Sequence, residues 1–485
     1  MLECVMDLVT PEWRSLCVNH AGRLTIPRLS TQQPPRPSQR LTPDLSVSKL
    51  TQAIFWSIFC PRCPKRPALE TTDSPMSILR KIINLQTQLP YSPLDPLETF
   101  LNSHWFVEYI LEQSDKIMDN WYFKPTNYER KHFLGDAVHR LQTSSLNRWT
   151  TFVAVGLVQS FFTGDMSQTS QHSYWMGHIE NSAKRELTRD LVPREMQQRR
   201  SDWVHISLMK TMIIPNSNTY QVLRSITPTF LQVVYSDPQL WPRGCSPTSI
   251  PLSNVLASEV HELAFFTFMD SACAMAFGLP QQVEYDTTIY SQQTRPPSHQ
   301  WAHSTPAYFQ LLFADINACR DKSPNARGWR EIEQCLQSWH FRSDEYTFAE
   351  SWMTIAWYAV QESWRLALLA YLYMAVCGTP SNDPRVQSCI KQILQVVRIV
   401  RERGPPRAHV SFFVQYLIVG ICARSEAHRK VVRDKLSAHD KLCIVRALDF
   451  VPVLDHLWHG AAAGGRPINW SDYMRSREEV LPIVI

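Results

Sequence analysis

Apolar residues recur at helical spacing along most of this chain. Beginning near residue 76, Ile78, Leu79, Ile82 and Ile83 repeat with a period of about 3.6 residues, which is typical of an amphipathic helix. The same pattern returns in blocks that proline, glycine or polar residues separate. It predicts helices over residues 78–89, 95–119, 126–141, 146–162, 172–191, 196–213, 253–278, 329–340, 348–376, 383–400, 412–422, 426–436 and 441–459.

Short local signals mark several of these helix boundaries. Residues 95–98 and 126–129 each have the spacing of a capping box, in which two side chains three positions apart accept hydrogen bonds from each other's backbone N–H. Asp383, followed by a proline, predicts a third helix start. Gly278 and Gly378 each precede a proline by two positions and predict helix ends, because glycine readily adopts the left-handed conformation that terminates many helices.

The pattern predicts an all-α fold. We find no stretch in which apolar and polar residues alternate for long enough to form a sheet, and no strict repeat of the kind that builds a solenoid. The expected architecture is an irregular array of antiparallel helix hairpins around an elongated core. The longest apolar runs, residues 366–378 and 412–423, are shorter than the roughly 20 residues of a membrane span and are interpreted as core helices.

The first 75 residues differ from the rest. The run over residues 32–39 (QQPPRPSQ) is polar and proline-rich, and proline blocks helix interiors. We expect residues 1–75 to be a disordered leader and residues 76–485 to form one helical domain. The stretch 281–306, which contains three prolines, is the expected place of any subdivision.

Composition fits an ordinary globular protein inside the cell. Of 485 residues, 44% are hydrophobic and 19% charged, so a large core is expected. The net charge of +5 is far below that of a dedicated nucleic-acid binder. The twelve cysteines are spread along the chain rather than spaced as in a disulfide scaffold, which favours a reducing compartment. No secretion signal is expected, because acidic residues interrupt the start of the chain.

Motifs of common enzymes are missing from the sequence. It has no phosphate-binding loop, no dinucleotide-binding glycine motif, no hydrolase nucleophile elbow and no adjacent pair of aspartates. His261 and Glu262 begin a zinc-protease pattern, but Phe265 stands where the second histidine is needed. We therefore expect no catalytic, cofactor-binding or metal-binding residues, and predict that the protein is not an enzyme.

Three weaker patterns leave alternatives open. Asp455, His456 and His459 suit the end of a helix, where histidines favour the exposed carbonyl groups, but they also permit a shared metal. Cys60 and Cys63 are interpreted as an incidental pair or as the remnant of a metal module. An aromatic stripe is expected to be core, with a ligand cavity as the alternative. It comprises Trp352, Trp357, Tyr358, Trp364, Tyr371 and Tyr373.

Several helical blocks resemble a known family, the fungal-specific transcription factor domain, in a form found in many basidiomycete regulators. The blocks include residues 262–279 (ELAFFTFMDSACAMAFGL), 313–323 (FADINACRDKS), 362–378 (ESWRLALLAYLYMAVCG), 383–397 (DPRVQSCIKQILQVV), 419–436 (VGICARSEAHRKVVRDKL) and 450–460 (FVPVLDHLWHG). The resemblance covers residues from about 75 to the end of the sequence. It carries no catalytic signature.

The resemblance implies a transcriptional regulator in the nucleus, acting through protein partners or as a homodimer. The family typically carries an N-terminal zinc cluster with six cysteines, whereas this sequence offers only Cys4, Cys17, Cys60 and Cys63. Direct DNA binding is therefore not expected, and either the cluster is absent from the protein or the gene model is incomplete. The alternative to a regulator is a helical interaction scaffold with no transcriptional role.

Overall fold

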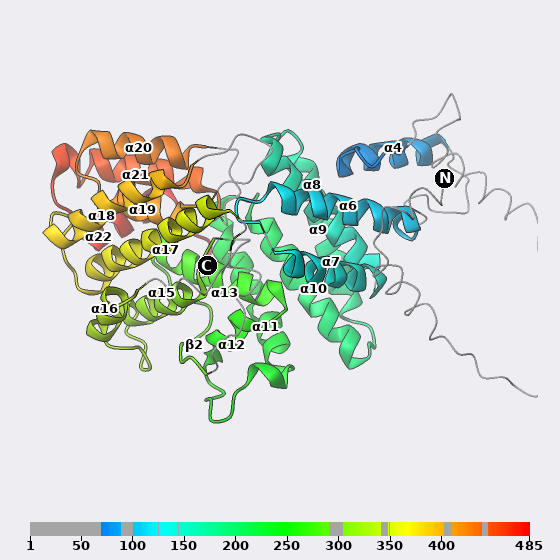
Figure 1. The fold of residues 1–485 in the computed structure, drawn as a ribbon, viewed down its shortest axis with the longest axis horizontal. Coiled ribbons are helices and arrows are strands. Elements are labelled where there is room, and N and C mark those ends of the chain that lie inside the picture. The colour runs from blue at the N-terminus through cyan, green and yellow to red at the C-terminus, as the bar shows by residue number, and fades with distance from the viewer. Residues whose placement is uncertain are drawn as a thin grey trace, which may run out of the picture. The chain divides into compact units, whose positions relative to one another are not determined.

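The computed structural model describes residues 69–88, 100–124, 126–143, 145–290, 304–340, 348, 350–401, 410–438 and 445–485. Residues Leu69–Ile485 form one compact unit. In the described residues the regular structure is helical, apart from one parallel pair of two-residue strands, β1 (Ile250–Pro251) and β2 (Tyr285–Asp286). The predicted all-α fold is confirmed (Figure 1). The predicted leader lies outside the described residues as far as residue 68.

The first helices of the described chain pack against one another. They are α4 (Pro75–Gln88), α6 (His104–Asn120), α7 (Asn127–Thr143), α8 (Ser145–Thr163), α9 (Thr169–Glu186) and α10 (Pro193–Thr211). Helix α8 packs on α6, α7, α9 and α10, and α9 packs on α10. An apolar cluster that includes Val153, Leu157, Met176 and Ile206 lies between α8, α9 and α10. Burying these side chains stabilises each helix against its neighbours.

Helix α13 (His261–Phe277) is enclosed by other helices. Its neighbours are α10, α11 (Thr219–Tyr235), α12 (Leu252–Ala257), α15 (Ala307–Arg320) and α19 (Phe413–Cys422). Every residue from Glu262 to Phe277 is buried. The ring of Phe266 stacks on Phe230 of α11 with centroids 4.0 Å apart. A helix that is apolar all round must lie inside the fold, and α13 does.

The last part of the chain adds a second group of helices, coloured from yellow to red in Figure 1. After α16 (Trp329–Gln337) come α17 (Ser351–Tyr371), the π-helical turn η3 (Leu372–Val376), α18 (Pro384–Val396), α20 (Glu426–Leu436), α21 (Val451–His459) and α22 (Trp470–Val480). Short 3-10 turns complete the set: η1 (Asn216–Asn218), η2 (Pro238–Leu240), η4 (Val397–Ile399), η5 (Ala447–Phe450) and η6 (Ala463–Gly465). Helix α17 packs on α15, α18 and α19, so its apolar core is continuous with that of α13.

Several predicted helix boundaries are confirmed. The backbone N–H of Thr126 donates to the Glu129 carboxylate at 2.6 Å, and the N–H of Glu129 donates to Thr126 Oγ1 at 3.3 Å, which completes the capping box of α7. The Asp383 carboxylate accepts from the backbone N–H of Arg385 at 2.8 Å and starts α18. Gly278 and Gly378 both have φ of 66° and end their helices.

Two predicted helices are interrupted. The segment over residues 253–278 forms α12 and α13, because the chain leaves the helix near Ser258, whose Oγ accepts from the backbone N–H of Val260 at 3.1 Å. In the segment 95–119, residues 95–99 lie outside the described residues, and a turn at Asn102 precedes α6. Ser103 caps α6 by accepting from the N–H of Phe106 at 3.2 Å, and the predicted cap at Asp95 lies outside the described residues.

Three helices are absent from the predicted set, and some predicted ends are misplaced. The additional helices are α11, α15 and α22. The helix predicted over residues 172–191 ends earlier, at Glu186, and the one over 348–376 ends as an α-helix at Tyr371 before the π turn. Of residues 441–459, the first four lie outside the described residues, and residues 447–459 form η5 and α21.

Candidate functional site

A cluster of buried charges joins α7, α10 and α13. Glu262, fully buried at the start of α13, accepts a hydrogen bond from Arg140 Nη2 at 3.0 Å and another from the hydroxyl of Ser201. Burial by itself raises the pKa of Glu262, but the charge of Arg140 and the bond from Ser201 outweigh it and lower the pKa to about 2. The carboxylate is therefore ionised and tied to two other helices.

In three neighbouring ionisable groups of this cluster, burial favours the neutral form. Burial raises the pKa of Asp202 to about 6, although Gln198 Nε2 donates to its carboxylate at 3.0 Å. Burial lowers the pKa of His205, and it lowers that of His261 to about 4. These histidines are therefore neutral at physiological pH.

In the incomplete zinc pattern at His261 and Glu262, the glutamate makes structural contacts. The Glu262 carboxylate accepts hydrogen bonds from Arg140 and Ser201. Within the described ranges, no group of three or more His, Cys, Asp or Glu side chains is arranged to hold a metal ion. What the cluster does is link the helices that precede α13 to α13 itself.

Residues 313–323 fasten the end of α13 to α15 and α17. Asn317 Nδ2 donates to the carbonyl of Ser271 at 3.0 Å, and its Oδ1 accepts from the Tyr371 hydroxyl at 2.7 Å. Arg320 donates from Nη1 to the carbonyl of Ala274 and from Nη2 to that of Leu279, each at 2.7 Å. The guanidinium satisfies carbonyl groups at the C-terminus of α13, which also favours a positive charge. This arrangement is structural.

Two buried carboxylates hold the segment that follows α13. Asp270 accepts from the backbone N–H of Gln282 at 2.8 Å and from the hydroxyl of Tyr285 at 2.9 Å, and burial raises its pKa to about 7. Asp315 accepts from Thr287 Oγ1 at 2.7 Å, and burial raises its pKa to about 6. Perturbed carboxylates often mark reactive sites, but here each is bonded to the chain segment that it anchors.

The Asp455, His456 and His459 side chains diverge. His459 Nδ1 lies 2.7 Å from the backbone carbonyl of Asp455. Asp455 accepts from Arg433 Nε at 3.1 Å, while His456 Nε2 lies 3.6 Å from a carboxylate oxygen of Glu479. The contact of His459 with its own helix carbonyl is that of a helix end, the reading favoured from the sequence.

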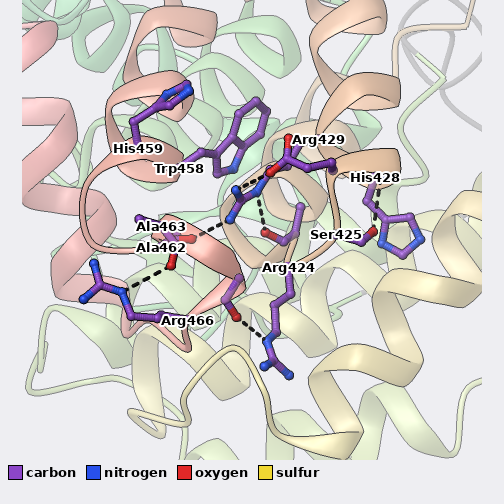
Figure 2. A network of polar contacts seen from close by, with 12 residues as sticks. Arg424, Ser425, His428, Arg429, Trp458, His459, Ala462, Ala463 and Arg466 are labelled. Carbon is purple, nitrogen blue, oxygen red and sulfur yellow. Dashed lines mark hydrogen bonds and ion pairs between the residues drawn. The ribbon is translucent and has the colours of Figure 1, made fainter.

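A buried arginine organises the same region. Arg429 donates from Nη2 to the carbonyl of Ala462 at 2.7 Å and from Nε to that of Ala423 at 3.3 Å (Figure 2). Its guanidinium lies 5.8 Å from the ring centroid of Trp458, and the Trp458 indole donates to the carbonyl of Gly420 at 2.9 Å. The network ties the loop after α21 to the junction of α19 and α20.

The aromatic stripe along α17 lies mainly in the core. Trp357, Trp364 and Tyr371 are each at most 2% exposed, while Trp352 and Tyr358 are half-buried. The Trp364 indole donates to the carbonyl of Ser304 at 3.1 Å. Tyr373, which belongs to η3, donates from its hydroxyl to Glu333 at 2.7 Å. These contacts fit the favoured reading of packed core rather than a cavity.

A pocket of about 330 Å³ lies elsewhere, where η4, α19, α20 and η5 meet near the end of α6. Its lining, as far as the structure describes it, contains no residue of the aromatic stripe and no carboxylate. It consists of Tyr122, Val397, Arg398, Val400, Arg401, Val410, Ser411, Phe412, Phe413, Tyr416, Lys435, Leu436 and Ala447. The sequence signals did not indicate this site, because its walls come from segments far apart in the chain.

A family model described as the fungal specific transcription factor domain matches residues 263–483. The match confirms the resemblance for this segment and supports a role in regulating transcription. No curated protein and no solved structure matches the chain. Cys4, Cys17, Cys60 and Cys63 lie outside the described residues. Among the helices described, none is long and apolar enough to cross a membrane.

Proposed function

We propose that this chain, whose residues 263–483 belong to the fungal-specific transcription factor domain family, is a transcriptional regulator that acts in the nucleus through protein partners. The observation that carries the proposal is the family match. The matched segment runs from α13 to beyond α22 and contains the networks around Arg320 and Arg429. Because these polar groups are bonded internally, the described residues favour a binding module over catalysis.

We extend the regulatory domain to the helices that precede the match. Arg140 on α7 and Ser201 on α10 both bind Glu262, which lies immediately before the matched segment. Helices α10 and α11 also cover α13 within one apolar core. Residues 76–485 are therefore proposed to work as one domain, with α13 as the element shared by both parts.

The helical packing and the low net charge are compatible with regulation through partners. A helical array can respond to a partner or ligand that binds one packing arrangement better than another, and the shift is limited by that difference in affinity. We propose protein partners or a homodimer as the source of DNA contact. The weak net charge of +5 also favours recruitment over direct electrostatic binding to DNA.

Three measurements test the proposal. The full chain, fused to an unrelated DNA-binding domain, is expected to change transcription of a reporter by at least severalfold relative to that domain alone. Deletion of the gene is expected to change a defined set of transcripts, and the tagged protein is expected in the nucleus. A protein that stays outside the nucleus, in cells whose transcripts do not respond to its deletion, would instead support the scaffold alternative.

A further inference from the structure

The pocket between η4, α19, α20 and η5 has the size and lining of a small-molecule site. Its volume of about 330 Å³ falls at the lower end of the range of roughly 300–1,000 Å³ found for ligand pockets. Its floor is apolar, since Val397, Val400, Phe412, Phe413 and Leu436 are buried. Such a floor favours a ligand with an apolar body of modest size.

The charged groups of the described lining all have the same sign. Among the described residues, Arg398, Arg401 and Lys435 belong to the pocket wall, and no aspartate or glutamate does. Arg398 and Arg401 are exposed, and within the described part of the chain neither has a hydrogen-bond or ion-pair partner. Two guanidinium groups without a carboxylate beside an apolar floor are complementary to a ligand that carries an anionic head group.

The backbone contributes smaller charges to the same wall. Phe412 and Phe413 lie at the start of α19, where the backbone N–H groups carry a partial positive charge. Phe412 provides no side-chain cap for these groups. The end of α20 at Leu436 adds a partial negative charge of about half an elementary charge. The two full positive charges of Arg398 and Arg401 outweigh it, so the described part of the lining is positive on balance.

We propose that this pocket binds a small amphipathic organic anion, with a carboxylate against Arg398 and Arg401 and an apolar body on Phe412 and Val400. Tyr122 lies two positions after the end of α6 and precedes the segment that matches the family. The other described lining residues lie within the matched segment. A bound ligand therefore touches both parts of the helical unit. Its role as an effector of transcription rests on the proposed function, while its binding does not.

Calorimetric titration of the full chain with three eight-carbon probes tests the site. Octanoate is expected to bind saturably, 1-octanol more weakly, and octylammonium not at all. Raising the ionic strength is expected to weaken octanoate binding, because the arginines are exposed to solvent. Absence of saturable octanoate binding, or equal binding of octanoate and octylammonium, overturns the proposal.

Variants locate the binding at this pocket. The double variant Arg398→Ala, Arg401→Ala is expected to raise the Kd for octanoate at least about tenfold while leaving that for 1-octanol nearly unchanged. Ala447→Phe, which fills the pocket from η5, is expected to weaken both ligands. Arg243→Ala is the matched control, since it removes an exposed arginine outside the pocket.

Octanoate binding and reporter activity together distinguish failure of the proposed ligand site from failure of the proposed function. Octanoate binding by the arginine double variant equal to that of the parent chain overturns the site, even if Ala447→Phe fails to fold. If the double variant loses octanoate but the reporter is unaffected by either change, the site stands and its effector role fails. If the parent chain binds octanoate yet shows no transcriptional activity at all, only the proposed function fails.

Discussion

Arg140 of α7 and Glu262 of α13 form an ion pair at 3.0 Å, although 122 positions separate them in the sequence. The side chain of Glu262 has no exposed surface, whereas that of Arg140 is 31% exposed. The pair therefore places a negative charge inside the fold and brings its counter-charge from the surface. The contribution of the pair to stability can therefore be measured by removing the arginine.

Arg140→Ala is expected to lower the free energy of unfolding by about 3 kcal/mol, because it removes the ion-pair partner of the buried Glu262 carboxylate. Urea unfolding followed by circular dichroism measures the change. Arg243→Ala is the control and is expected to change stability by less than about 0.5 kcal/mol. Equal midpoints for the two variants would show that the pair does not stabilise the fold.

Asp270 is expected to make stability depend on pH. Its folded pKa of about 7 lies above the ordinary 3.8, so the folded state favours the protonated acid. The resulting stability is fully present below about pH 4 and is lost as pH rises toward 7, by an amount on the order of 4 kcal/mol. Asp270→Asn, which stays neutral, is expected to flatten this part of the pH profile of the melting temperature.

An unchanged slope in the Asp270→Asn variant would contradict this assignment. The buried Asp315, whose pKa is raised to about 6, contributes in the same direction and remains in both proteins. The comparison between the two profiles therefore isolates Asp270. Retention of the helical spectrum at pH 5 in both proteins is the control for folding.

Gly420→Ala is expected to destabilise the protein by about 1–3 kcal/mol through overpacking. A Cβ at this position would lie 2.7 Å from Leu454 Cδ1 and 2.9 Å from Val432 Cγ1, so α19 could not keep its distance from α20 and α21. Gly135→Ala on α7 is the matched control, since a Cβ there meets no atom within 4 Å. It should stabilise its helix by up to about 1 kcal/mol. Melting temperatures that shift in the same direction would refute the packing argument.

His459→Ala is expected to change stability by less than about 0.5 kcal/mol, and added zinc is expected to leave the melting temperature of the parent chain unchanged. The reason is that His456 and His459 lie against different groups, a Glu479 carboxylate and a backbone carbonyl. A thermal shift by zinc that disappears in His459→Ala would restore the metal alternative.

Local signals in the sequence predicted the helices that depend on local physics. The capping box of Thr126 and Glu129 and the Asp383 cap form as expected, because each needs only residues within one helical turn. Helix α11 was missed since it contains Pro228, which ordinarily interrupts a helix. Burial of Leu223, Ile226 and Phe230 outweighs that preference, and burial depends on distant partners.

The candidate sites were less predictable than the helices. The absence of enzyme motifs could be read directly from the sequence, but the role of Arg320 depends on the carbonyl groups of Ala274 and Leu279, which lie 46 and 41 positions away. The pocket likewise joins Tyr122 to residues near 400 and 436, a proximity that no spacing along the chain encodes. Contacts of this kind follow from how helices pack, which periodicity alone does not determine.

The enclosure of α13 has a practical consequence for dissecting the gene. The family match begins at residue 263, one position after Glu262 and inside the first turn of α13. A fragment cut at that boundary would strip away α10 and α11 and leave Phe266 without Phe230. Aggregation of such a fragment would imitate loss of activity, so deletion mapping should start upstream of Leu69 rather than at the edge of the match.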